Sequence, residues 1–237
     1  MTERGRDDLS RDASTFAVGP SSMRWEDGAL TIDFDERAVP TMKRLKGKVR
    51  LVPEAVNEEA FSIAQDHWWR PVAPDARIEV EVESAGIRWS GRGYHDTNWG
   101  PVGLEHDFRR WNWSRAKSST GATSILYDVE LRRAEAHTLA LRFDRDAKIE
   151  RFEPPARQKL RRGLWGVRRD IQCDADVRPR IVRTLEDAPF YTRAEVRSRL
   201  HGEDVVSVHE CLDGDRFGSG WVKALLPFRM PRRARKR

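Results

Sequence analysis

The sequence lacks any long apolar run. No stretch of about 18 or more apolar residues occurs, so no segment is predicted to cross a membrane as a helix. Residues 1–14 are polar and mixed in charge, and they lack the apolar centre of a secretion signal. From these features we expect a cytoplasmic protein.

Cysteine is scarce: the 237 residues include only Cys173 and Cys211. In a cytoplasmic protein these are expected to be free thiols, with a single disulfide as the alternative. Two cysteines so far apart do not indicate a metal site. The sequence also has no glycine-rich phosphate loop, no His-Glu-x-x-His and no Gly-x-Ser-x-Gly motif. We therefore expect neither a metal nor an organic cofactor.

Charged residues are abundant, and the net charge is +6, from 44 Lys and Arg against 38 Asp and Glu. The basic excess is concentrated in a tail, residues 230–237. Such a tail can hold a protein to an anionic membrane surface at about 1 kcal/mol per basic residue. A solvated terminus is the equal alternative. Nucleic-acid binding is the weakest interpretation, because it needs basic residues interleaved with exposed aromatics over a larger surface.

Short segments of period-two alternation dominate the chain. In residues 77–83, for example, Ile78, Val80 and Val82 share one face and charged residues the other. Similar patterns predict strands at residues 29–35, 46–52, 124–131, 138–143, 180–185 and 204–211. Short helices are predicted only at 192–200 and 104–110. Polar turns between the strands favour an antiparallel sandwich or up-and-down barrel, and the predicted fold class is all-β.

Tryptophan is concentrated in the middle of the chain. Of the nine Trp residues, six lie between residues 66 and 115: Trp68, Trp69, Trp89, Trp99, Trp111 and Trp113. Such an inventory suits a deep apolar pocket with a few polar groups at its end. If residues 94–99 are extended, Tyr94 and Asp96 share one face, and the same rule pairs His67 with Trp69.

Two motifs in this region carry a resemblance. They are Gly91-x-Gly93-Tyr94-x-Asp96-x-Asn98-Trp99-Gly100 and Phe108-x-x-Trp111-x-Trp113-Ser114-Arg115-Ala116. Together with residues 182–191, 208–210 and 225–231, they resemble the acyclic carotenoid 1,2-hydratases (hydroxyneurosporene synthases) of phototrophic bacteria. The first motif alone is shared with a wider group of lipocalin-like proteins, and the C-terminal segments make the resemblance specific. It spans about residues 25–231.

The resemblance implies two lipocalin-like β-units, antiparallel barrels or sandwiches, at residues 1–100 and 101–229, followed by the basic tail at 230–237. Family members usually carry a further aromatic-rich segment upstream, so we expect the first unit to be incomplete at its N-terminus. The implied activity is addition of water to the C1=C2 double bond of an acyclic carotenoid, such as neurosporene or lycopene, without a cofactor. Because a carotenoid resides in the bilayer, peripheral association with the inner or photosynthetic membrane is also implied.

The resemblance also implies the site residues. Asp96 is the expected proton donor, Tyr94 orients the acid or the water, His67 positions Asp96 or accepts a proton, and Trp69 stabilises the cation. Burial among aromatics keeps a carboxylic acid neutral, and aromatic faces stabilise a cation. The expected substrate-binding residues are Trp68, Trp99, Trp111 and Trp113, of which the last two have core packing as an alternative.

A non-catalytic lipocalin-like protein that binds a lipid or terpenoid is the main alternative. It accounts equally well for the aromatic pocket and for the β-pattern. It does not need an acid in the pocket, so a solvent-exposed Asp96 would favour it. The sequence leaves the choice among linear carotenoids and the oligomeric state open.

Overall fold

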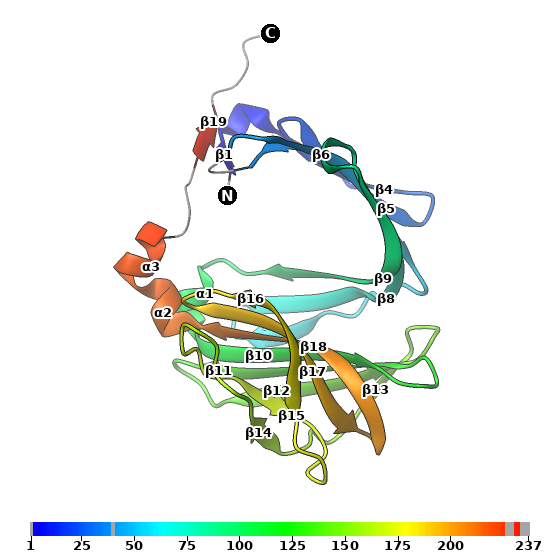
Figure 1. The fold of residues 1–237 in the computed structure, drawn as a ribbon, viewed down its shortest axis with the longest axis vertical. Coiled ribbons are helices and arrows are strands. Elements are labelled where there is room, and N and C mark those ends of the chain that lie inside the picture. The colour runs from blue at the N-terminus through cyan, green and yellow to red at the C-terminus, as the bar shows by residue number, and fades with distance from the viewer. Residues whose placement is uncertain (1, 39–40, 226–229, 233–237) are drawn as a thin grey trace. The chain divides into compact units, whose positions relative to one another are not determined.

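The protein is built mainly of antiparallel strands (Figure 1). The computed structural model describes residues 2–38, 41–225 and 230–232. The predicted all-β class is confirmed, because the helices are few and short. Within the described ranges, no helix is long and apolar enough to cross a membrane. Most of the predicted basic tail, residues 233–237, lies outside the described residues.

The chain divides into two compact units. The first consists of residues 1–56, 73–95 and 225–237, and the second of residues 57–72 and 96–224. Two long strands, β8 (His67–Val82) and β9 (Ile87–Trp99), contribute residues to both units. The lipocalin-like units predicted at 1–100 and 101–229 stay a prediction.

The first unit carries the N-terminal strands of an eight-stranded sheet. These are β2 (Leu9–Arg11), β3 (Thr15–Val18), β4 (Ser21–Glu26), β5 (Ala29–Arg37) and β6 (Arg44–Pro53). The sheet order is β2-β3-β4-β5-β6-β8-β7, where β7 is Phe61–Ala64, and β9 also pairs with β8. Two 3₁₀ turns lie at Arg6–Asp8 and Glu83–Ala85, and β1 (Thr2–Arg4) pairs with β19 (Met230–Arg232). The strands predicted at 29–35, 46–52 and 77–83 are thereby confirmed.

Local chemistry explains why these strands form. Asp27 and Gly28 both have positive φ, and an Asp-Gly pair with this geometry favours the two-residue hairpin that joins β4 to β5. On β8, the apolar residues from Ile78 to Val82 are half-buried and alternate with exposed charges. Gly93 on β9 lies so close to β8 that a Cβ there would be 3.2 Å from Cβ of Ile78.

The second unit is organised around a seven-stranded sheet, in the order β13-β12-β11-β10-β18-β17-β16 (Figure 1). Its strands are β10 (Phe108–Lys117), β11 (Thr123–Leu131), β12 (His137–Phe143), β13 (Ile149–Arg151), β16 (Arg180–Asp187), β17 (Tyr191–Leu200) and β18 (Glu203–Asp213). A separate pair, β14 (Arg157–Lys159) and β15 (Asp170–Gln172), is joined by the loop 160–169. The helices α1 (Leu104–Asp107), α2 (Gly214–Gly218) and α3 (Gly220–Leu225) are short.

The helix predicted at 192–200 is wrong, because this segment is strand β17. Its residues alternate between buried and less buried positions, with Ala194 and Val196 in the core between charged neighbours. His201 and Gly202 both have positive φ and form the tight turn that returns the chain as β18. The helix predicted at 104–110 is only four residues long, and β10 begins at Phe108.

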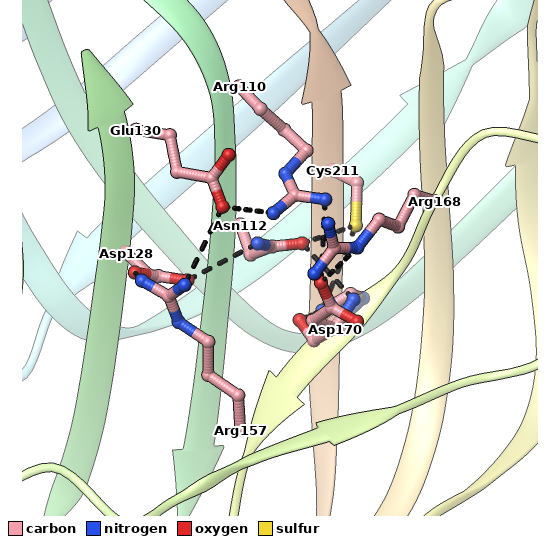
Figure 2. A network of polar contacts seen from close by, with 9 residues as sticks. Arg110, Asn112, Asp128, Glu130, Arg157, Arg168, Asp170 and Cys211 are labelled. Atoms are coloured by element: carbon pink, nitrogen blue, oxygen red, sulfur yellow. Dashed lines mark hydrogen bonds and ion pairs between the residues drawn. The ribbon is translucent and has the colours of Figure 1, made fainter. Parts of the chain in front are cut away.

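A buried polar network fixes β15 against the sheet of the second unit (Figure 2). Asn112 on β10 donates to the carboxylate of Asp128 at 3.3 Å. Its Oδ1 accepts hydrogen bonds from the thiol of Cys211 at 2.8 Å and the backbone N–H of Asp170 at 3.3 Å. Burial raises the pKa of Cys211 to about 12, so the thiol stays neutral. As expected, Cys211 and Cys173 are both free thiols.

Candidate active site

One face of the seven-stranded sheet carries two adjacent rows of large side chains. Strand register places four residues side by side across β11, β10, β18 and β17: Tyr127, Trp113, Glu210 and Arg193. The next row on the same face, two positions along each strand, consists of Val129, Trp111, Leu212 and Tyr191. This face concentrates aromatic rings and one carboxylate within the second unit.

The aromatic rings form a continuous cluster. The ring of Trp69 meets Tyr127 edge-on, with centroids 5.3 Å apart. Trp111 lies 5.7 Å from Tyr127 and 6.2 Å from Tyr191, in both cases edge to face. Edge-to-face contacts favour the interaction of the electron-poor rim of one ring with the electron-rich face of the next. Trp69 itself is fully buried, with 0% of its surface exposed.

A carboxylate is attached to this cluster. The indole Nε1 of Trp69 donates a hydrogen bond to Oδ2 of Asp96 at 2.8 Å. Asp96 is half-buried on β9, and Tyr94 precedes it by two residues on the same extended strand, so the two side chains share a face as predicted. Half-burial and a fully buried partner distinguish Asp96 from a solvent-exposed turn residue.

Two tyrosines of the cluster are held in the neutral form. Burial raises the pKa of Tyr127, and the nearby negative charges of Asp96 and Glu210 raise it further. Burial likewise raises the pKa of Tyr191, with Glu210 adding to the effect. Arg193 donates to Glu210 at 2.8 Å and to the hydroxyl of Tyr191 at 3.1 Å. The charge of Glu210 is thus balanced by a neighbour on the same sheet face.

His67 is buried and held from several sides. Its Nδ1 lies 2.8 Å from Oδ2 of Asp107, an ion-pair distance without hydrogen-bond alignment, and its Nε2 lies 3.1 Å from the carbonyl oxygen of Val102. The ring meets Phe108 edge-on at 5.1 Å. Gly100 passes so close that a Cβ there would be 2.4 Å from Cδ2 of His67. His67 therefore anchors the chain from Gly100 to Phe108, and it shares the buried face of β8 with Trp69, as predicted.

The four tryptophans expected to bind substrate differ in their surroundings. Trp68 and Trp99 are 40% and 46% exposed. Trp111 and Trp113 share the aromatic face, as their spacing on β10 predicts, and Trp113 is buried. The indole Nε1 of Trp111 is buried and has no hydrogen-bond partner among the described residues. It is therefore a donor that a small polar molecule in the cluster can use.

Sequence reasoning assigned no role to Tyr127, Tyr191, Arg193 or Glu210. Tyr127 lies in a segment correctly predicted as a strand, but nothing in that segment shows which strand pairs with it. Tyr191 and Arg193 belong to the strand that was predicted as a helix from residue 192 on. A period-two interpretation of residues 191–200, with its alternating charges, is the signal that would have placed them.

The architecture matches a solved structure. The crystal structure assigned to AttH from Nitrosomonas europaea superposes with a TM-score of 0.55 at 11% identity, covering 85% of this chain and 69% of that one. This similarity concerns the fold alone. The fold and the site together define an all-β protein with a half-buried carboxylate held at an aromatic sheet face.

The family model described as carotenoid hydratase CrtC matches residues 1–237, and the chain belongs to this family. A relative named acyclic carotenoid 1,2-hydratase from Thiocapsa roseopersicina is 46% identical over 98% of this chain. A second relative of the same name, from Rubrivivax gelatinosus, is 43% identical over 99% of this chain. The chain spans 58% of the length of each of these two curated relatives.

Proposed function

We propose that this protein is an acyclic carotenoid 1,2-hydratase, which adds water across the C1=C2 double bond of a linear carotenoid by acid catalysis. The product is a 1-hydroxy carotenoid. Family membership and the names of the two relatives support the substrate class. The observation that carries the chemistry is the carboxyl group of Asp96, held by a buried indole beside neutral aromatic rings.

Asp96 is the proposed acid. Its Oδ2 accepts the Trp69 indole N–H, which orients the carboxyl group, and the reaction requires that group to carry a proton when the alkene is bound. That proton is transferred to C2, and the π electrons of the alkene form the new C2–H bond. A tertiary cation remains at C1, and Asp96 becomes a carboxylate. Tyr94, two residues away on the same strand, is proposed to orient the acid.

The aromatic cluster is proposed to stabilise the cation. A desolvated aromatic face can contribute about 2 kcal/mol to binding a cation. Trp111 and Tyr191 are suited to this role because they are only partly buried. Trp69 is completely buried and donates a hydrogen bond to Asp96. We therefore propose that Trp69 positions Asp96 and does not contact the cation directly.

Water completes the reaction. A lone pair on the water oxygen forms the C1–O bond, and one proton of that water returns to the carboxylate of Asp96. The unpartnered indole N–H of Trp111 is proposed to hold the water by donating a hydrogen bond to its oxygen. His67, held by Asp107 and Val102, is proposed to position the segment that follows Asp96. The proton that Asp96 gives to C2 is replaced by one from the water. The reaction therefore consumes only water and needs no cofactor.

The substrate resides in a bilayer, so the proposal includes peripheral association of a cytoplasmic protein with the inner or photosynthetic membrane. The basic tail at 230–237 is one proposed contact. Each basic residue near an anionic surface contributes about 1 kcal/mol.

The test is anaerobic incubation with lycopene or neurosporene in liposomes, followed by chromatography and mass analysis. The relative from Thiocapsa roseopersicina serves as the positive control, and Asp96→Asn keeps the shape of the side chain while removing the acid. A water adduct formed by the protein and lost in Asp96→Asn would support the proposal. Carotenoid binding without an adduct, while the relative turns over, would overturn it in favour of a non-catalytic carotenoid-binding protein.

A further inference from the structure

The loop 160–169 of the second unit is rigidly anchored although its tip is exposed. The backbone N–H of Leu164 donates to Oδ2 of Asp187 at 2.6 Å, and Arg216 donates to the carbonyl oxygen of Trp165 at 2.6 Å. Gly163 approaches Asp187 so closely that a Cβ would lie 2.0 Å from its carboxylate. Despite these anchors, the Leu164 side chain is 90% exposed. A fixed backbone therefore presents an apolar side chain to the outside.

Two tryptophans extend this apolar tip. Trp165 is 42% exposed and Trp221, on α3, is 50% exposed. Their ring centroids are 6.4 Å apart. Half-exposed tryptophans are typical of protein surfaces that lie at the level of lipid headgroups.

A strongly basic groove of about 1010 Å³ adjoins the tip. Leu164 and Val182 contribute apolar surface to it. Among the described residues, those that line it and carry a positive charge are Lys159, Arg161, Arg162, Arg169, Arg178 and Arg180, against one acidic residue, Asp187. Asp187 is already engaged by the Leu164 N–H and by Arg169, whose guanidinium lies 3.5 Å away. The groove therefore presents uncompensated positive charge.

The buried floor of the groove points to an anionic ligand. Arg169 is 2% exposed, and beyond the 3.5 Å ion pair of its Nη2 with Asp187, its Nε and Nη2 form no hydrogen bonds with the described residues. A buried guanidinium with unused donors is costly unless an anion or water satisfies it. Phosphate groups match the planar donor fork of arginine.

We propose that the basic groove and the exposed tip, Leu164, Trp165 and Trp221, form a docking surface for an anionic bilayer. The basic side chains contact lipid phosphates, and the apolar tip inserts at the headgroup level. Asp187 at the end of β16 and Tyr191 at the start of β17 are separated by three residues, so the docking surface adjoins the aromatic cluster along the chain. The idea that carotenoid reaches the protein through this surface rests on the proposed function. Binding of this surface to a membrane can be tested without any carotenoid.

A bilayer fits the surface better than a nucleic acid does. Nucleic-acid grooves combine basic residues with aromatic rings that stack on bases. They do not need an aliphatic side chain that is 90% exposed at a rigid tip, as Leu164 is. Charge and apolar insertion together are the combination that holds proteins at anionic membrane surfaces.

The experiment is cosedimentation of the full chain with two kinds of vesicle, phosphatidylcholine alone and equimolar phosphatidylcholine and phosphatidylglycerol, both free of carotenoid. The charge variant is Arg161→Glu/Arg162→Glu/Arg178→Glu, and its matched control is Arg11→Glu/Arg77→Glu/Arg133→Glu, at exposed positions elsewhere. The tip variant is Leu164→Ser, with Ile87→Ser, 50% exposed, as its control. Thermal melting verifies that every variant is folded.

We expect binding to the anionic vesicles to fall about a hundredfold in the charge variant, since each basic residue near the surface contributes about fivefold. Leu164→Ser is expected to weaken binding about tenfold. Both controls are expected to bind within about twofold of the native chain, because a charge or side chain remote from the bilayer contributes little. Inorganic phosphate at matched ionic strength is not expected to compete.

Several outcomes would overturn the proposal. These are equal binding by the charge variant and its control, equal binding to both vesicle types, or complete loss of binding when the basic residues at 232–237 alone are replaced by serine. Displacement by inorganic phosphate would indicate a site for a free anion, and tighter binding to single-stranded DNA a nucleic-acid surface. A hydration assay with carotenoid dissolved in detergent tests the proposed function separately, because it does not require vesicle docking.

Discussion

Trp69 and Asp96 are linked by a 2.8 Å hydrogen bond from the indole Nε1 to the carboxylate Oδ2. The two residues are 27 positions apart, on neighbouring strands β8 and β9. Because Trp69 is completely buried, this bond is shielded from competition by bulk water. It orients the carboxyl group of Asp96 at the edge of the aromatic cluster.

Replacing Trp69 by Phe retains an aromatic side chain and removes the indole donor. A typical intramolecular hydrogen bond contributes about 0.5–1.5 kcal/mol. We therefore expect the rate of hydration to fall by up to about tenfold, because Asp96 loses the donor that orients it. Steady-state rates and carotenoid affinity, measured for Trp69→Phe and the native chain, test this, and the affinity should change much less than the rate. An unchanged rate would argue against an effect through Asp96.

Removing the indole of Trp111 should affect turnover more than binding. Trp111→Leu retains apolar surface but eliminates the aromatic face and the unpartnered N–H. Loss of about 2 kcal/mol of cation stabilisation corresponds to about a thirtyfold slower reaction. Carotenoid affinity, measured by quenching of tryptophan fluorescence, should change by much less. A parallel loss of affinity and rate would indicate that Trp111 binds the ground state only.

Gly100 is required by the close approach of His67. A Cβ at this position would lie 2.4 Å from Cδ2 and 2.7 Å from Nε2 of the buried ring. We expect Gly100→Ala to lower the free energy of unfolding by about 1–3 kcal/mol, the usual range for overpacking. Gly5→Ala, where a Cβ would meet nothing within 4 Å, is the control. Denaturant titration measures both variants, and the same loss in a His67→Ala background would exclude this contact as the cause.

Because His209 is buried, we expect the free energy of unfolding to depend on pH. Burial, with the positive charge of Arg169 adding to it, lowers the pKa of His209 from 6.5 to about 4, although the backbone carbonyl of Asp170 partly opposes the shift. Between these two pH values the unfolded chain binds a proton that the folded chain does not, so stability falls as the pH drops from 6.5 toward 4. The whole shift corresponds to roughly 3 kcal/mol.

The control variant is His209→Gln, whose side chain cannot titrate. Its amide keeps a donor for the carbonyl oxygen of Asp170, which Nε2 of His209 contacts at 3.0 Å. Denaturant midpoints measured at pH 7 and pH 5 should decline more in the native chain than in the variant. Equal declines would mean that other groups cause the pH dependence.

The sequence by itself determined the fold class, most strands and the local geometry of the motifs. Alternation of apolar and charged residues is a short-range property, so β5, β6, β8, β11 and β12 were predictable from their own residues. The same rule correctly paired His67 with Trp69 on a shared face. It failed at residues 192–200, where the turn at His201 and Gly202 makes the segment one arm of a hairpin.

Only the tertiary structure decided which of these faces meet. The spacing of Asp96 does not specify Trp69 as its hydrogen-bond donor, because strand pairing is set by packing over the whole sheet. For the same reason Tyr127 and Glu210, 83 positions apart, share one row only through the register of β11, β10 and β18. Period-two patterns determine which side chains share a face of one strand. Register and sheet packing determine which side chains of other strands lie beside them, and the candidate site consists of side chains brought together in this way.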